Sequence, residues 1–255
     1  MRRPLIALAL LAVALPRDAV ALFGQQDART RQCMTTLTRA LPANVSDAMK
    51  HIDGPRRRLL ALRSYLRNRD ALADKWSWSA EQIARYQASS EARLVQLELA
   101  NITRRFEVSN PGHTLYVNSQ VRSLDAQISK WNENESVGAA AKALQKAAAR
   151  SAPRDGCSSP ESAETFRQFL GGWHAPRAPT LAAPGLSKHG QARAFDFQVK
   201  RGDAIVAGTE SSRSISAWDK AGWTERLRNA VTGASGKFKG PLFNSVAVVS
   251  IIYNF

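Results

Sequence analysis

Two residues near position 190 have the chemistry of metal ligands. His189 and Asp196 lie seven residues apart in the segment Ser187–Asp196. A zinc ion accepts a neutral imidazole nitrogen and a carboxylate oxygen, so a histidine on a loop and an aspartate on the following strand can supply two of its ligands. The same spacing also suits a structural histidine that caps a loop. From this pair alone, the structural interpretation is favoured.

The segment that follows His189 has the alternation of a half-buried strand. In a strand over Ala194–Val199, Phe195 and Phe197 point to one face of the sheet and Asp196 points to the other. Asp196 is therefore expected to lie away from the phenylalanine side, which is the side that packs into a core.

The rest of the C-terminal part predicts a small sheet with one helix. A turn at 201–203 predicts a hairpin to a second strand at 204–206. Residues 218–231 have a helical pattern, and the continuous apolar character of 245–253 favours a buried final strand.

The chain from residue 25 to about residue 106 has a helical pattern. Asp53 can cap a helix whose first turn contains Pro55, and Ser79 with Gln82 forms the capping-box pair of a second, long helix. The apolar residues expected on the buried side of that second helix are Ile83, Tyr86, Leu94, Leu97 and Ile102.

A turn signal at 110–112 marks a boundary, and a short strand is expected at Thr114–Val117. The proline-rich segment 171–185 has no periodicity and predicts either an ordered loop over a site or a simple connector. Further helices are expected at 123–131, 139–150 and 160–170.

The N-terminus has the layout of a secretory signal peptide. Arg2 and Arg3 precede the apolar run 5–15, and small residues occupy 19–21. The run is shorter than the ~20 residues that span a bilayer. We expect cleavage near Ala21 and an exported protein of the periplasm or cell envelope, with a retained membrane anchor as the alternative. No later stretch predicts a transmembrane helix.

The chain is strongly basic. Its net charge of +15 falls to +13 without residues 1–21. Outside the cytoplasm this charge suits anionic surfaces such as cell-wall polymers, and the export signal argues against nucleic acid as a partner. A solvated surface that aids solubility explains the charge equally well.

The only two cysteines are Cys33 and Cys157. In an oxidising compartment two thiols pair when their geometry allows it. Because the two sulfurs are far apart in sequence and form no C-x-x-C pattern, a cysteine-based zinc site is not expected.

The segment around His189 resembles the pattern Ser-x-His-x-x-Gly-x-Ala-x-Asp of the zinc D-alanyl-D-alanine carboxypeptidases, a family of bacterial cell-wall peptidases. Ser187 and Ala194 match, and His189 and Asp196 fall on the zinc ligands. Ala192 replaces the glycine of the family. This change is mild if the backbone at Ala192 keeps a negative φ, a conformation that alanine accepts.

A second segment, Val117–Ser123, resembles the family's Ser-Gly-x-Arg-Ser and aligns Arg122 with the arginine that holds the substrate near the scissile peptide. Arginine suits this role because its planar fork offers two donors and stays protonated. A surface arginine that pairs locally is the other interpretation. The resemblance continues at 218–227 and 238–242, and 76–106 is similar to an extension in an exported bacterial branch.

The final strand departs from the family, whose members carry Glu-Pro-Trp-His there and so gain the general base and the third zinc ligand. Here Val249 stands at the position of the glutamate and Ile252 at that of the histidine. Two ligands hold zinc weakly, and without a base no water is activated. His113 and His174 are the candidate substitute ligands. The altered strand is either natural or the product of a shifted reading frame near Leu242.

The resemblance implies an α+β fold, a small antiparallel sheet with flanking helices of the zinc D,D-peptidase type, preceded by a helical N-terminal extension. The expected divisions are a signal peptide at 1–21, the helical extension at 22–109 and the carboxypeptidase-like domain at 110–255.

The implied reaction is zinc-assisted hydrolysis of the D-alanyl-D-alanine bond in the peptidoglycan stem peptide. His189 and Asp196 would hold zinc, and Arg122 would orient the substrate. Because the base is missing, we expect an inactive or weakened copy that holds zinc weakly or not at all. Two alternatives stay open: a non-catalytic muropeptide-binding or envelope scaffold protein, and a working peptidase with a rearranged zinc site.

Overall fold

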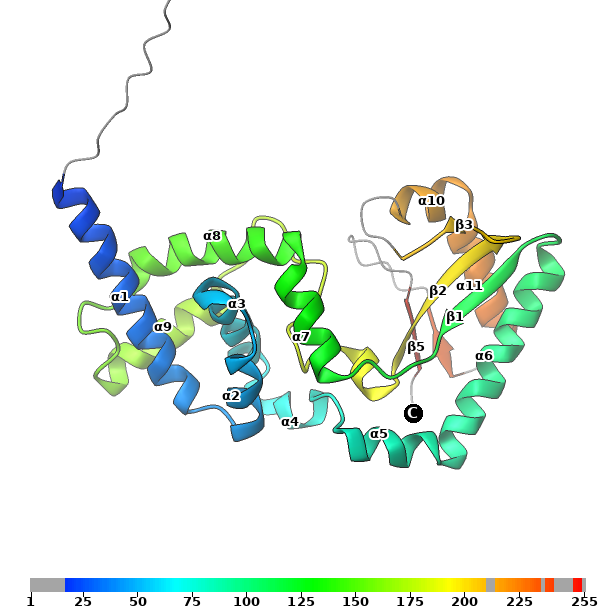
Figure 1. Ribbon diagram of the computed structural model, residues 1–255, viewed down its shortest axis with the longest axis horizontal. Coiled ribbons are helices and arrows are strands. Elements are labelled where there is room, and N and C mark those ends of the chain that lie inside the picture. The colour runs from blue at the N-terminus through cyan, green and yellow to red at the C-terminus, as the bar shows by residue number, and fades with distance from the viewer. Residues whose placement is uncertain (1–16, 210–213, 235–236, 241–249, 254–255) are drawn as a thin grey trace, which may run out of the picture.

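The computed structural model describes residues 17–209, 214–234, 237–240 and 250–253. The described part of the chain is mostly helical with a small antiparallel sheet, an α+β architecture as expected. It forms two lobes that lie side by side along the long axis of the molecule (Figure 1). The helical lobe consists of α1 (Arg17–Arg39), α2 (Ala43–Lys50), α3 (Gly54–Arg67), the short helix Arg69–Ala71, α4 (Leu72–Lys75), α7 (Leu124–Glu133), α8 (Glu135–Ser151) and α9 (Pro160–Gly172).

The sheet lobe combines helices with five described strands. The strand order is β1-β2-β5-β4, and β3 also pairs with β2. All of these pairings are antiparallel. The elements of this lobe are α5 (Ala80–Gln87), α6 (Ser90–Ser109), β1 (Thr114–Asn118), the 3₁₀ helix Lys188–Gln191, β2 (Ala194–Arg201), β3 (Ala204–Ala207), α10 (Ser214–Lys220), α11 (Trp223–Ala234), β4 (Phe238–Lys239) and β5 (Ser250–Tyr253).

The helical lobe has its own hydrophobic core, and the buried apolar side chains of α3 belong to it. Cys33 on α1 and Cys157 in the loop before α9 form a disulfide with a Cα–Cα distance of 4.9 Å. Both cysteines are buried, so the disulfide ties two elements of the same core together. Asp53 precedes α3, but its side chain makes no capping hydrogen bond.

The second core lies between the sheet and its helices. Phe195 and Phe197 of β2 are buried there, as the alternation of the strand predicts. Phe106 of α6 and Leu115 of β1 belong to this same core. The predicted domain division at residue 110 therefore falls between two elements that pack together, and as a division of the chain it stays a prediction.

The long helix predicted from Ser79 is two helices. The capping box of Ser79 and Gln82 starts α5 as expected, but Ser89 caps a new helix, α6. The interruption changes which face of α6 is buried, and the expectation for two residues was wrong: Leu94 is 53% exposed and Leu97 is 63% exposed. The buried apolar side chains of α6 are those of Ala92, Val95, Leu99, Ile102 and Phe106.

The C-terminal elements mostly follow the sequence. The hairpin of β2 and β3 is present, whereas the single helix expected at 218–231 is interrupted at Gly222, which adopts a φ of +71°. Of the predicted final strand, 250–253 forms β5, and 245–249 lies outside the described residues. The predicted cleavage site at Ala21 falls in α1 and stays a prediction.

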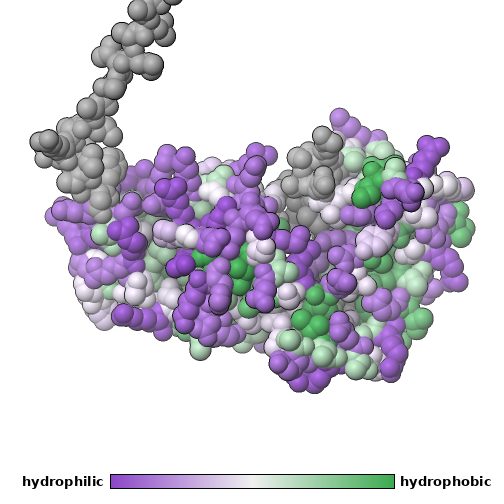
Figure 2. Space-filling view, viewed as in Figure 1, coloured by the Kyte–Doolittle hydropathy of each residue, from purple (hydrophilic) through white to green (hydrophobic). Residues whose placement is uncertain are grey.

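The visible surface is mostly hydrophilic over the helical lobe and more mixed over the sheet lobe (Figure 2). None of the helices in the described ranges combines the length and the apolar character that crossing a bilayer requires.

Candidate functional site

Asp196 lies at the centre of the candidate site. This aspartate is 9% exposed and lies on β2. Its Oδ2 accepts a hydrogen bond from Arg122 Nη2 at 2.8 Å, and its Oδ1 lies 3.4 Å from His189 Nε2. The structure thus brings together the three residues that the sequence singles out for ligand and metal binding.

The backbone explains why these three residues meet. β1 pairs with β2 in a register that aligns Asn118 with Asp196, and Arg122 follows four residues later. The Arg122 N–H donates to the His189 carbonyl at 3.0 Å. His189 lies on the 3₁₀ helix directly before β2. The cluster therefore depends on strand pairing between segments that are 74 residues apart.

The surroundings of His189 favour the neutral form of its imidazole by lowering its pKa. Burial lowers the pKa of its imidazole, the nearby Asp196 carboxylate opposes this shift, and the Arg122 guanidinium adds to the lowering. The side chain of His189 is only 14% exposed. A neutral imidazole has a free nitrogen lone pair, which is the form that a metal ion requires.

The condition under which the change at Ala192 would be mild, a negative φ, is not met. Its backbone is left-handed, with φ +53° and ψ +27°, and it ends the 3₁₀ helix that carries His189. An L-residue in this region brings its Cβ close to the following carbonyl, which costs roughly 1–2 kcal/mol. A glycine at this position would avoid the strain, so alanine here is not a mild substitute for it.

The β5 side of Asp196 differs from the β1 side. The register of β2 with β5 aligns Ile252 with Ala194 and Ser250 with Asp196. Ile252, which the resemblance aligns with a third zinc ligand, thus lies next to β2 in the sheet, and isoleucine carries no donor atom. Val249, at the position of the base, lies outside the described residues.

The donor set in the described part of the chain does not fit a catalytic zinc ion. No group of three His, Cys, Asp or Glu residues lies close enough there to hold a metal. His113 packs against the Trp223 ring at 4.7 Å, and His174 is exposed. Neither histidine joins His189 and Asp196 in such a group. The Arg122 guanidinium also holds a fixed positive charge against the carboxylate that a metal would need.

Sequence reasoning missed two residues that support the site, Gln127 and Ser77. Gln127 on α7 is 6% exposed, and its Nε2 donates to the Arg122 carbonyl at 3.0 Å and to Ser77 Oγ at 2.8 Å. No local pattern signals Gln127, because its hydrogen-bond partners come from three separate segments of the chain.

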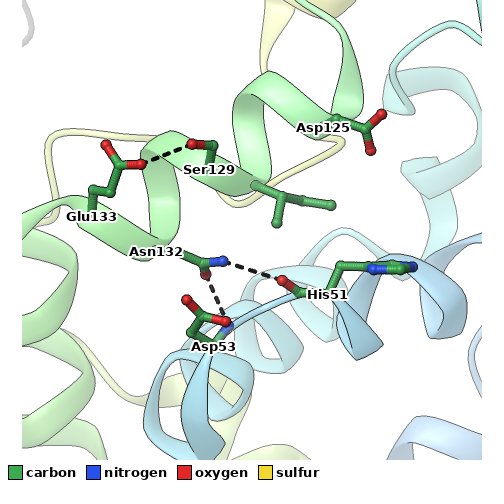
Figure 3. Close-up of a pocket in the computed structure, with 7 residues that line it drawn as sticks. His51, Asp53, Asp125, Ser129, Asn132 and Glu133 are labelled. Atoms are coloured by element: carbon green, nitrogen blue, oxygen red, sulfur yellow. Dashed lines mark hydrogen bonds between the residues drawn. The ribbon is translucent and has the colours of Figure 1, made fainter.

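A separate pocket of about 370 Å³ lies between α7 and the corner of α2 and α3 (Figure 3). Asn132 joins its two sides, since its Nδ2 donates to the His51 carbonyl at 3.1 Å and its Oδ1 accepts from the Asp53 N–H at 2.9 Å. The lining residues are His51, Asp53, Asp125, Ile128, Ser129, Asn132 and Glu133. None of the sequence-predicted site residues lines it.

Comparisons of this chain with protein-family models, with curated proteins and with solved structures found no match.

Proposed function

We propose that this protein binds the D-alanyl-D-alanine end of the peptidoglycan stem peptide and does not hydrolyse it. The proposal combines the resemblance of Val117–Ser123 and Ser187–Asp196 to the carboxypeptidases with the cluster of Arg122, His189 and Asp196. The protein would be an exported, carboxypeptidase-like binding protein of the cell envelope.

The orientation of the Arg122 guanidinium carries this proposal. One ion pair, from Nη2 to Asp196, fixes the group, and its other N–H donors make no hydrogen bond within the described residues. The side chain is 22% exposed, so a ligand can reach those donors. A planar fork with free donors matches the two oxygens of a terminal carboxylate.

The missing groups are the reason to propose binding without turnover. A general base contributes about 10²-fold to 10⁴-fold to a hydrolysis rate, and a catalytic zinc ion needs three protein ligands. Val249 and Ile252 supply neither function. Zinc is therefore expected to bind weakly or not at all, and ligand binding through Arg122 does not require it.

The location and the partner follow from the N-terminal signal and the charge. The net charge of +13 that remains without residues 1–21 would attract the anionic polymers of a cell wall and raise the local concentration of the protein near its ligand. Nucleic acid is not proposed as a partner.

Calorimetry with a peptide that ends in D-alanyl-D-alanine tests the proposal. We expect binding that persists in EDTA and that weakens about tenfold or more when the C-terminal carboxylate is amidated, because a charge-assisted pair is lost. Arg122→Lys should weaken binding similarly, whereas Arg104→Ala, at an exposed position on α6, should not. Equal affinity for the acid and the amide would refute the proposed site.

A weak zinc peptidase is the second candidate, favoured by the neutral His189 beside Asp196. It predicts release of free D-alanine on incubation with zinc, and EDTA should stop that release. We expect the unmodified protein to release no more D-alanine than the Asp196→Ala variant does. Sustained, EDTA-sensitive release by the unmodified protein would replace the binding function with a hydrolytic one.

A further inference from the structure

Gln127 connects three segments that are distant in sequence. Its Oε1 accepts a hydrogen bond from the Gly185 N–H at 3.0 Å, and its Nε2 donates to Ser77 Oγ and to the Arg122 carbonyl. Both N–H groups and the carbonyl of the carboxamide are thus used, and the amide is buried. A fully satisfied buried amide favours one arrangement of the segments it joins.

The same contacts extend to the loop that carries His189. The Ser77 N–H donates to the Gly185 carbonyl at 2.8 Å, and the Trp78 N–H donates to the Gly190 carbonyl at 2.9 Å. Gly190 packs so closely here that an added Cβ would lie 2.7 Å from Gln127 Nε2. The neighbour of His189 is therefore fixed against the amide that holds the backbone of Arg122.

The position of this network gives the helical lobe a role at the site. Ser77 follows α4 of the helical lobe, and Gln127 lies on α7 of the same lobe. Arg122 and His189 belong to the segments that enter the sheet lobe, and Figure 1 shows α7 on the side of the helical lobe that faces the sheet lobe. The helical lobe thus contacts the backbone of Arg122 and the His189 loop through side-chain and backbone hydrogen bonds.

We propose that Gln127 is a positioning residue that fixes the backbone of Arg122 for ligand binding. Through Gln127, the helical lobe holds Arg122 in the orientation that the site requires. The contacts of its carboxamide hold the Arg122 backbone, and Asp196 then orients the guanidinium. The identity of the ligand rests on the proposed function, whereas the hydrogen bonds of Gln127 do not depend on it. In metal sites, replacing a residue that orients a ligand side chain commonly lowers affinity about tenfold or more, and we expect an effect of the same order for Arg122.

The test uses Gln127→Met, which keeps the approximate size of the side chain and removes all three hydrogen bonds. The matched control is Asn132→Leu, because Asn132 is also an amide on α7 that joins two segments but does not contact Arg122 (Figure 3). We expect about tenfold weaker peptide binding for Gln127→Met than for the control, after their free energies of unfolding have been compared.

A second readout does not need the peptide. In arginine-labelled protein, the Nε–Hε NMR signal of Arg122 is the one absent from Arg122→Lys. We expect Gln127→Met to move this signal toward the shifts of exposed arginines and to accelerate its exchange with water several-fold, because its orientation is lost. Asn132→Leu should leave the signal in place.

A milder variant covers the case in which Gln127→Met does not fold. Ser77→Ala removes one partner of the Gln127 amide and should shift the Arg122 signal in the same direction by a smaller amount. An unchanged Arg122 signal and unchanged affinity in the folded variants overturn the positioning role. If the unmodified protein binds no peptide, the proposed function fails, and the NMR signal alone then decides the role of Gln127.

Discussion

The two neighbours of β2 in the sheet differ in what they bring to Asp196. On the β1 side, the register leads to Arg122, which meets Asp196 and contacts the backbone of His189. On the β5 side, Ser250 and Ile252 align with the start of β2. One side supplies a cation and hydrogen-bond donors, while the other supplies no acid or imidazole in its described residues.

This difference shows that strand pairing and site chemistry can separate. β5 pairs with β2 through backbone groups, which every non-proline residue offers. An apolar strand can therefore pair in the sheet without carrying any residue that would activate water. The side that orients a ligand depends instead on particular side chains, and those are present.

The largest expected effect comes from making the β5 side resemble the family. Val249→Glu with Ile252→His restores the missing residue types, and we expect the purified protein to change from retaining little zinc to retaining close to one ion per chain, because three ligands then converge. Metal analysis after dialysis measures this. The control, Val249→Glu with Ile251→His, moves the imidazole to the opposite face of the strand. Equal zinc in both variants would contradict the proposed position of the third ligand.

The next largest effect is expected on the free energy of unfolding, when a buried side chain of β2 is removed from the core of the sheet lobe. Phe197 is fully buried under β2, and Phe197→Ala is expected to lower the free energy of unfolding by about 3–5 kcal/mol through the cavity it leaves. Denaturant unfolding measures the change. Ile205→Ala on β3, where Ile205 is 54% exposed, should lower it by about 1 kcal/mol or less. If both variants lost a similar amount of unfolding free energy, Phe197 would not belong to the core of the sheet lobe.

A smaller loss of unfolding free energy is expected when only the contacts of Asp196 with Arg122 and His189 are broken. Asp196→Asn keeps the shape of the side chain but removes the charge that Arg122 and His189 face, so the free energy of unfolding should fall by about 1.5–3 kcal/mol. Peptide affinity should fall as well, since the guanidinium is no longer oriented. Asp203→Asn in the exposed β2–β3 turn is the control. A stable variant with full affinity would show that the ion pair does not orient Arg122.

The sequence predicted most of the elements because their signals are local. The capping box at Ser79, the alternation through Phe195 and Phe197, and the turn before β3 each act within a few residues, and the structure contains all three features. The pattern of α6 was misread because the interruption at Ser89 changed its buried face. The two cysteines were expected to pair if close enough, and they do.

The site was harder to predict because it depends on non-local contacts. Motif resemblance selected Arg122, His189 and Asp196, and the structure brings them together, but nothing local shows that both carboxylate oxygens face these partners. Gln127 was missed for the same reason, since its partners come from three separate segments. Roles in zinc and substrate binding stay predictions.

Ala192 gives the smallest expected effect and the most direct test of how far the His189 loop has departed from the family pattern. With φ at +53°, replacement by glycine relieves roughly 1–2 kcal/mol of strain and loses about 0.4–1 kcal/mol through the greater freedom of the unfolded chain. Ala192→Gly should therefore raise the free energy of unfolding by about 0.5–1 kcal/mol. The same substitution at Ala194, a strand residue two positions on, should lower it by a similar amount, because only the entropic loss remains. If both substitutions destabilise the protein in denaturant unfolding, Ala192 is not strained, and the change from glycine at this position leaves the His189 loop unaffected. If Ala192→Gly alone stabilises the protein, the backbone at this position favours glycine, as the resemblance to the carboxypeptidase pattern implies.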